Sequence, residues 1–181
     1  MSFLNNVFIG IPLPKDLLIR YRAYLSNLKE IYPTAKLNNS ENIHITILFL
    51  GRQVVNNIGL IEKSVADHSS VLKDCHLELS ELGYFNNAHY DVLHLKVKQN
   101  KKLIEFFNLI KTDLNHLFLS EKNSFSPHLT LARINNQDRG SMSGTALLAD
   151  VSWNFPVEVI NIYGRDENLK NRQIILANKS M

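Results

Sequence analysis

The stretch H-I-T-I-L-F-L-G at residues 44–51 places a histidine and a threonine two positions apart within an apolar run. Side chains alternate between the two faces of a β-strand, so His44 and Thr46 share one face and Ile45 lies on the other. By the same parity, Phe49 is expected to point into the core beside Ile45. The stretch therefore predicts a strand with one core face and one face that is free for chemistry.

A second copy of this pattern occurs in S-P-H-L-T-L-A-R at residues 126–133. His128 and Thr130 again share one strand face, and Leu129 lies on the opposite face. Pro127 suits the first position of a strand, where no ladder donor is required. The paired H-x-T motifs are a stronger indication of function than either histidine alone, which would more often be structural.

The two motifs fall at matching places in a repeated order of elements. Apolar spacing in the first half predicts strands and amphipathic helices in this order: a strand at 7–11, a helix from 15, a strand at 43–50, a helix at 54–71 and a strand at 76–85. The second half repeats it with a strand from 92, a helix at 103–118, the strand that carries the second motif, a weaker helix near 146, and strands at 155–163 and 173–177.

This repetition predicts one domain built from two lobes by internal duplication, at roughly residues 1–85 and 90–181. If the lobes pack about a pseudo-two-fold axis, two imidazoles and two hydroxyls meet across a cleft. Two imidazoles can hold opposite protonation states near neutral pH, so that one takes a proton while the other gives one. Threonine hydroxyls beside them can donate hydrogen bonds to a charged oxygen, which suits in-line displacement at phosphorus without a metal.

Composition limits the classes of protein that remain. The chain has 181 residues, 45% of them hydrophobic, and a net charge of +3, which describes a globular and mildly basic protein. Cys75 is the only cysteine, so no internal disulfide is expected. Pro12 and Pro14 interrupt the apolar N-terminus and no run reaches membrane-spanning length, so we expect a soluble cytoplasmic protein.

At these motifs the sequence resembles the two-histidine phosphoesterases, and within them the 2′-5′ RNA ligase-like RNA 2′,3′-cyclic phosphodiesterases. The stretch F-I-G-I-P-L-P at residues 8–14 resembles the opening strand of that family. The resemblance covers nearly the whole chain. It implies a bilobal α+β fold in which antiparallel sheets line a central cleft and helices lie outside.

The resemblance also implies the reaction and its residues. A terminal 2′,3′-cyclic phosphate on RNA would be opened to a 2′-phosphate, with reversible 2′-5′ ligation as a side activity and no cofactor. His44 is assigned as the proton donor to the departing 3′ oxygen and His128 as the proton acceptor from water, although the two roles could be exchanged. Thr46 and Thr130 are expected to hold phosphate oxygens, and Arg133 matches an arginine of the family pattern that suits a phosphate.

Two parts of the sequence depart from simple expectations. Arg133 lies five residues after His128, so it faces the cleft only if the strand ends or bulges between them. The C-terminal region differs from the family pattern, which leaves the roles of Arg165 and Arg172 open. On the strand from residue 92, the residues His94, Lys96 and Lys98 share a face that could contact RNA, but a solvated face is the more common explanation.

Several alternatives remain at this level. A zinc site on the two motif histidines would need a third ligand, and none sits at a recognisable spacing. The same chemistry could act on 2′-5′-linked oligonucleotides or small cyclic nucleotides instead of RNA ends. The protein could also be a module that binds an RNA end without turnover. We expect a monomer, and we expect the remaining histidines to be surface or cap residues: His68, His76, His89 and His116.

Overall fold

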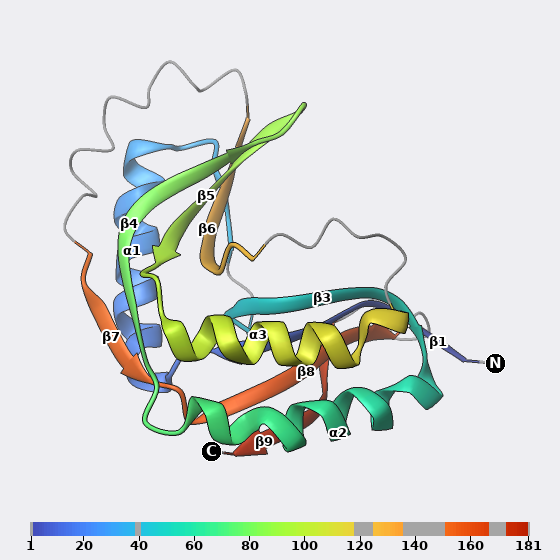
Figure 1. Cartoon of the computed structure of the whole chain (residues 1–181). Coiled ribbons are helices and arrows are strands. Elements are labelled where there is room, and N and C mark those ends of the chain that lie inside the picture. Colours follow the sequence, from blue (N-terminus) through green and yellow to red (C-terminus); the bar gives the residue numbers. More distant parts are fainter. Residues whose placement is uncertain (1, 39–40, 118–124, 136–150, 167–172, 181) are drawn as a thin grey trace.

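A computed structural model describes residues 2–38, 41–117, 125–135, 151–166 and 173–180. Its main feature is a strongly curved, nine-stranded sheet (Figure 1). All strand pairs in this sheet are antiparallel. Together with the helices on its outside, the sheet confirms the predicted α+β fold.

Three α-helices are interspersed among the nine strands of the described residues. The strands are β1 (Phe3–Pro12), β2 (Lys36–Leu37), β3 (His44–Val54), β4 (His76–Asn86), β5 (Tyr90–Val97), β6 (His128–Asn135), β7 (Trp153–Pro156), β8 (Val159–Asp166) and β9 (Gln173–Ser180). The helices are α1 (Lys15–Ile31), α2 (Ile58–His68) and α3 (Lys101–Asp113), with short 3-10 turns η1 (Val55–Asn57), η2 (Ser69–Leu72) and η3 (Asn115–Leu117).

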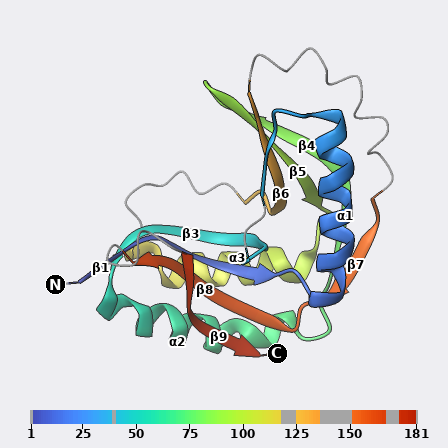
Figure 2. The same ribbon diagram turned by 180° about the vertical axis from the view of Figure 1, so that it is seen from behind.

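The sheet has two halves that meet where β3 pairs with β6 at Ile45 and Leu129. Helix α1 lies beside the half formed by β7, β4, β5 and β6, whereas α2 and α3 lie along the half formed by β3, β1, β8 and β9 (Figures 1 and 2). The strand order along the sheet is β7-β4-β5-β6-β3-β1-β8-β9, and β2 pairs with β6. The second half therefore combines strands from both ends of the chain, whereas the four strands of the first half come from residues 76–156. The internal duplication and its lobe boundaries stay a prediction.

Helix α1 shows why the sequence pattern was informative. Its buried residues Leu17, Tyr21, Leu25 and Leu28 recur every three or four positions and form one apolar face. The ring of Tyr24 meets the buried Trp153 of β7 edge to face, with centroids 5.8 Å apart. Trp153 therefore packs in the core.

Helix α3 begins at a side-chain cap. The side chain of Asn100 accepts a hydrogen bond from the backbone N–H of Leu103 at 3.0 Å, which satisfies one of the free donors of the first turn. Its predicted apolar stripe is buried, including Phe106 and Phe107. The weaker helix predicted near Ala146 lies outside the described residues.

Candidate active site

Both H-x-T motifs carry a β-bulge at the same place. In β3, Thr46 pairs with Gly10 and Leu48 pairs with Ile9, so Ile47 is the extra residue between them. A bulge inserts one residue into one strand, and the face that each later side chain occupies is therefore reversed. Ile47 and Leu48 are accordingly both buried.

The bulge in β6 has the same position relative to its histidine. Thr130 pairs with His94 and Ala132 pairs with Leu93, which leaves Leu131 as the extra residue. Leu131 and Ala132 are both buried. In each motif the fifth residue after the histidine is thereby returned to the histidine's own face.

The change of face at each bulge shows that the prediction for Phe49 was wrong and that the condition set for Arg133 is met. Phe49 is not a core residue, because the bulge turns it to the His44 face, where 47% of its surface is exposed. Arg133 does reach the cleft, because the bulge in β6 turns it to the side of His128. Simple alternation failed at Phe49 because the bulge depends on how β3 pairs with β1, which the motif alone does not reveal.

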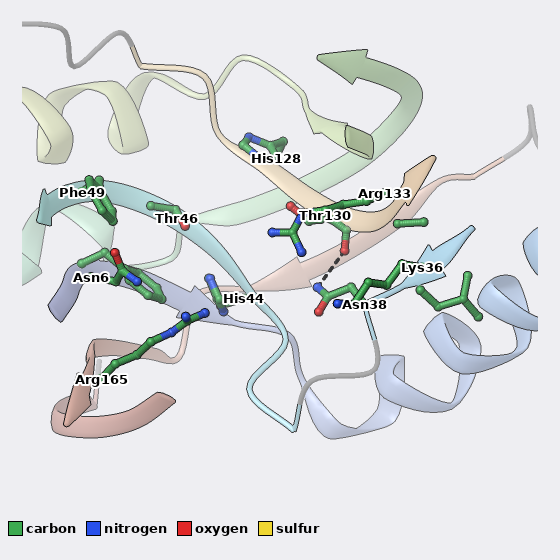
Figure 3. A pocket seen from close by; sticks show the side chains of 13 residues that line it. Asn6, Lys36, Asn38, His44, Thr46, Phe49, His128, Thr130, Arg133 and Arg165 are labelled. Atoms are coloured by element: carbon green, nitrogen blue, oxygen red, sulfur yellow. Dashed lines mark hydrogen bonds between the residues drawn. The ribbon is translucent and has the colours of Figure 1, made fainter. Parts of the chain in front are cut away.

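The two motifs face one cavity of about 460 Å³ between the halves of the sheet (Figure 3). The residues that line it are Asn6, Phe8, Lys36, Leu37, Asn38, His44, Thr46, Phe49, His128, Thr130, Ala132, Arg133 and Arg165. It brings together all five residues singled out from the sequence. Arg172 lies outside the described residues.

Both histidines are held through the same ring nitrogen. Nδ1 of His44 lies 2.6 Å from the carbonyl oxygen of Asn42, and Nδ1 of His128 lies 2.8 Å from the carbonyl oxygen of Ser126. A carbonyl only accepts, so Nδ1 of each ring donates and holds a proton. Nε2 is then the atom of each ring that can take up or release a proton toward a ligand.

His44 sits against aromatic rings. The ring centroids of Phe8 and Tyr163 lie 4.5 and 5.0 Å from that of His44. Burial in this environment lowers the pKa of His44, an effect that the hydrogen bond to Asn42 opposes and the charge of His128 reinforces. The two imidazoles are therefore close enough for the charge of His128 to act on the protonation of His44.

The strand that carries His128 is anchored from α1 and from Asn38, the residue that follows β2. The hydroxyl of Tyr21 lies 3.0 Å from the backbone oxygen of Thr130, and the side-chain amide of Asn38 donates to the same oxygen at 3.0 Å (Figure 3). Tyr21 also lies 2.9 Å from the backbone oxygen of Asn38. These contacts fix the backbone of the second motif at the point where it bulges.

The cavity is positively charged. Lys36, Arg133 and Arg165 line it, and among the described residues that line it there is no aspartate or glutamate. Arg165 reaches it from β8, where it pairs with Asn5 of β1. Two acid–base groups, two hydroxyls and three cations together form a site suited to proton transfer on a phosphate ester.

Several lining residues were given no role from the sequence. Lys36 and Arg165 carry no motif, and only the strand order brings them to the cavity. Asn6 has a left-handed φ of 50°, at an irregularity between Leu4 and Val7 in β1. The signal for it was the Asn-Asn pair at positions 5–6, since asparagine tolerates this conformation within an otherwise apolar strand.

The other histidines differ in their surroundings. His76, His89 and His116 are exposed, and His68 lies 2.7 Å from the Asp113 carboxylate, which agrees with surface roles. His94 does not lie on a solvated face, because it is buried between neighbouring strands.

The two lysines predicted on the same strand face as His94 are solvated. Lys96 pairs with Glu81 at 3.0 Å and Lys98 pairs with Glu78 at 2.7 Å. Within the described parts of the chain, no three His, Cys, Asp or Glu side chains gather as a metal-ligand set. No helix in those parts has the length and apolarity needed to cross a membrane.

The sequence is similar to that of characterised proteins. Residues 6–158 match the model of the family described as the AKAP7 2′5′ RNA ligase-like domain. A Bacillus subtilis protein named RNA 2′,3′-cyclic phosphodiesterase is 30% identical over 130 residues, which cover 71% of this chain and 70% of the relative. A Methanocaldococcus jannaschii protein of the same name is 25% identical over 129 residues, 71% of each chain.

Solved structures share the fold. LigT of Escherichia coli in its apo form superposes with a TM-score of 0.68 at 16% sequence identity, over 98% of each chain. A crystal structure described as a phosphoesterase gives a TM-score of 0.67 at 16% identity, also over 98% of each chain. At this level of identity the likeness establishes the α+β architecture and its curved antiparallel sheet.

Proposed function

Since the chain belongs to the AKAP7 2′5′ RNA ligase-like domain family, we propose that it is an RNA 2′,3′-cyclic phosphodiesterase that opens a terminal cyclic phosphate to a 2′-phosphate. The observation that carries this proposal is the matched pair of motifs in one cationic cavity: His44 with Thr46, and His128 with Thr130. The names of the Bacillus and Methanocaldococcus relatives support the same reaction.

The proposed reaction needs one proton removed and one delivered. Nε2 of His128 takes a proton from water as the water oxygen bonds to phosphorus. The bond between phosphorus and O3′ breaks, and Nε2–H of His44 gives its proton to O3′, which leaves the phosphate on O2′. The two histidines end in exchanged protonation states, and proton exchange with solvent restores them.

The hydroxyls and cations would stabilise the phosphoryl group during this step. Thr46 and Thr130 each lie two residues after a histidine on the same strand face, where their hydroxyls can donate to non-bridging oxygens. The guanidinium of Arg133 can bind the same group through two parallel hydrogen bonds. In this proposal the charge of the phosphate is balanced by side chains, and the reaction uses no cofactor.

The burial of His44 is compatible with the role of an acid. A lowered pKa makes its imidazolium a stronger proton donor, and the negative charge of a bound phosphate favours the protonated form. The same direction would also suit a base, so the roles need a separate test. An activated phosphodiester with a nitrophenolate leaving group needs no proton on that group, so His44→Ala should keep activity on it while His128→Ala should not.

The geometry also supports 2′-5′ ligation as a reverse-type reaction at the same site. If a 5′-hydroxyl replaces water, His128 takes its proton, the bond to O3′ breaks as before, and phosphorus stays on O2′. The new linkage is therefore 2′-5′ rather than 3′-5′. Only the nucleophile differs between the two reactions.

The substrate is proposed to be an RNA end. The exposed ring of Phe49 can stack on a nucleobase, a contact that does not depend strongly on which base it is. Lys36 and Arg165 add positive charge beyond what one cyclic phosphate requires, and further phosphates of an RNA chain would use it. Raised salt should accordingly weaken binding of an oligonucleotide more than binding of a mononucleotide.

Turnover separates this proposal from a binding module. Wild-type protein should hydrolyse an RNA ending in a 2′,3′-cyclic phosphate in the presence of excess chelator. Binding without any hydrolysis would favour the binding module, and loss of activity on chelation without loss of fold would favour a metal site. Higher efficiency on 2′-5′-linked oligonucleotides or small cyclic nucleotides would reassign the substrate and keep the chemistry. We further propose a monomer located in the cytoplasm, which size-exclusion chromatography and cell fractionation test.

A further inference from the structure

Each motif histidine is flanked by two further rings, but the rings come from different strands. His44 lies against Phe8 of β1 and Tyr163 of β8, which stack on each other with centroids 4.8 Å apart. His128 lies against two rings of the other half of the sheet. The centroid of Phe85 is 4.8 Å from that of His128, and the centroid of His94 is 5.0 Å from it.

The pair beside His128 is itself tightly packed. The rings of Phe85 and His94 stack with centroids 4.1 Å apart and planes 17° from parallel. Both stand across the ring of His128, at interplanar angles of 76° and 61°. His94 is 3% exposed and its Nδ1 lies 3.2 Å from the carbonyl oxygen of Val92, so the pair is fixed from behind.

A glycine makes room for this pair. Gly83 of β4 pairs with His94, and a Cβ added at Gly83 would lie 2.8 Å from Nε2 of His94 and 2.9 Å from Cε of Lys96. In the other half, Gly10 plays a similar part, since a Cβ there would lie 3.3 Å from the ring of Tyr163. In both halves a missing side chain lets a ring lie behind a motif histidine.

His94 is uncharged near neutral pH. Burial lowers the pKa of His94 to about 4, and the charges of His128 on β6 and Lys96 on β5 act in the same direction. Lys96 is in turn paired with Glu81 of β4. A neutral His94 gives His128 a rigid neighbour without opposing its protonation.

We propose that Phe85 and His94 are positioning residues that hold the imidazole of His128 in its reactive orientation. Neither lines the catalytic cavity, so neither is a catalytic residue. The hydrogen bond from Nδ1 to Ser126 fixes one edge of the ring, and the stacked pair restricts its rotation about that edge. This proposal rests on the proposed phosphodiesterase reaction, in which a misplaced proton acceptor lowers turnover more than binding.

Three variants and a matched control test it. Phe85→Leu removes the stacked ring from a half-exposed position, and Phe85→Tyr keeps it. Gly83→Ala pushes on His94 without touching a catalytic group. Gly59→Ala is the control, since nothing lies within 4 Å of a Cβ at that position. Thermal unfolding of each variant confirms that it is folded, and NMR of the imidazole resonances reports on His128 without requiring turnover.

For Phe85→Leu and Gly83→Ala, kcat should fall about tenfold or more while KM changes less than about threefold. The resonances of His128 should move, and those of His44 should not. Phe85→Tyr and Gly59→Ala should resemble wild type. Folded Phe85→Leu and Gly83→Ala proteins with unchanged kcat, or with unchanged His128 resonances, would overturn the proposal. If wild type opens no cyclic phosphate, the proposed function fails, and the NMR result alone then decides whether this pair positions His128.

Discussion

The half of the site that contains His44 and the half that contains His128 have the same backbone arrangement, the shared frame, and differ in the side chains attached to it. Both have a histidine bonded through Nδ1 to a carbonyl two residues earlier, a threonine two residues later, and a bulge at the third residue after the histidine. The fifth residue after the histidine is Phe49 in one half and Arg133 in the other. The matching bulges therefore place an aromatic ring on one side of the cavity and a guanidinium on the other.

The difference extends to the surroundings of each histidine. His44 lies against Phe8 and Tyr163, and burial there lowers its pKa. His128 lies against Phe85 and His94, and its strand is anchored by polar contacts from Tyr21 and Asn38. In the cavity, the ring of Phe49 suits a nucleoside and the guanidinium of Arg133 suits its phosphates. The comparison indicates how a repeated strand motif can build a site that receives an asymmetric substrate in one direction.

The largest expected effect is the loss of activity on removal of either motif histidine, and it should be similar for the two halves of the site. His44→Ala and His128→Ala should each lower kcat/KM on a cyclic phosphate by about 10³-fold, because each removes one of two proton transfers. His76→Ala is the matched control, since this histidine is exposed and does not line the cavity. Rate measurements on the three purified proteins check this, and a variant that keeps near wild-type activity would show that the two halves are not catalytic partners.

Removal of the hydroxyls should have the next largest effect. Thr46→Val and Thr130→Val keep the shape of the side chain, and each should lower kcat by about 10²-fold if its hydroxyl stabilises charge on the phosphate in the transition state. Because both threonines occupy the same place in the shared frame, the losses should be similar. A fall in only one of them, measured under saturating substrate, would restrict phosphate stabilisation to that half.

Substitution of the two fifth residues should separate the halves. Arg133→Met and Phe49→Leu should each raise KM for an RNA end by about tenfold, the first through a lost ionic hydrogen bond and the second through lost stacking. The rise in KM caused by Arg133→Met should become smaller at higher salt concentration, because salt screens charge. The rise in KM caused by Phe49→Leu should not. KM measured at low and high salt checks this. An equal salt dependence of KM in the two variants would contradict an ionic role for Arg133 and a stacking role for Phe49.

The smallest effect is a shift along the pH axis. Burial lowers the pKa of His44, so its titration midpoint should lie below the ordinary histidine value of about 6.5. One limb of the bell-shaped kcat/KM profile should follow the pKa of His44, because each limb of such a profile reports on one of the groups that exchange protons. Phe8→Leu opens the aromatic environment to water and should move both the limb and the NMR midpoint of His44 to higher pH. A midpoint at or above 6.5 in wild type would contradict this account.

The strand face on which each motif residue lies could be predicted from the sequence, because the alternation of side chains along a strand is a local property. His44, Thr46, His128 and Thr130 were all placed correctly on the cavity side by parity. Phe49 was placed on the wrong side, because the bulge in β3 is a property of its pairing with β1. Arg133 was predicted to reach the cleft only through an end or bulge of its strand, and the bulge is present.

The rest of the site depended on tertiary structure. Lys36 and Arg165 reach the cavity because β2 pairs with β6 and because β8 pairs with β1, and no local pattern specifies either neighbour. His94 looked like a solvated strand residue, since it shares a strand face with two lysines. Its burial follows from Gly83 on the adjacent strand, which leaves room for the ring.

The most direct test of the central claim is the identity of the product. RNA ending in a 2′,3′-cyclic phosphate should be incubated with the wild type, His44→Ala and His128→Ala proteins in excess chelator, and the position of the terminal phosphate determined. This account predicts a 2′-phosphate with wild type and unreacted cyclic ends with both variants. A 3′-phosphate product, or equal turnover by either variant, would contradict it.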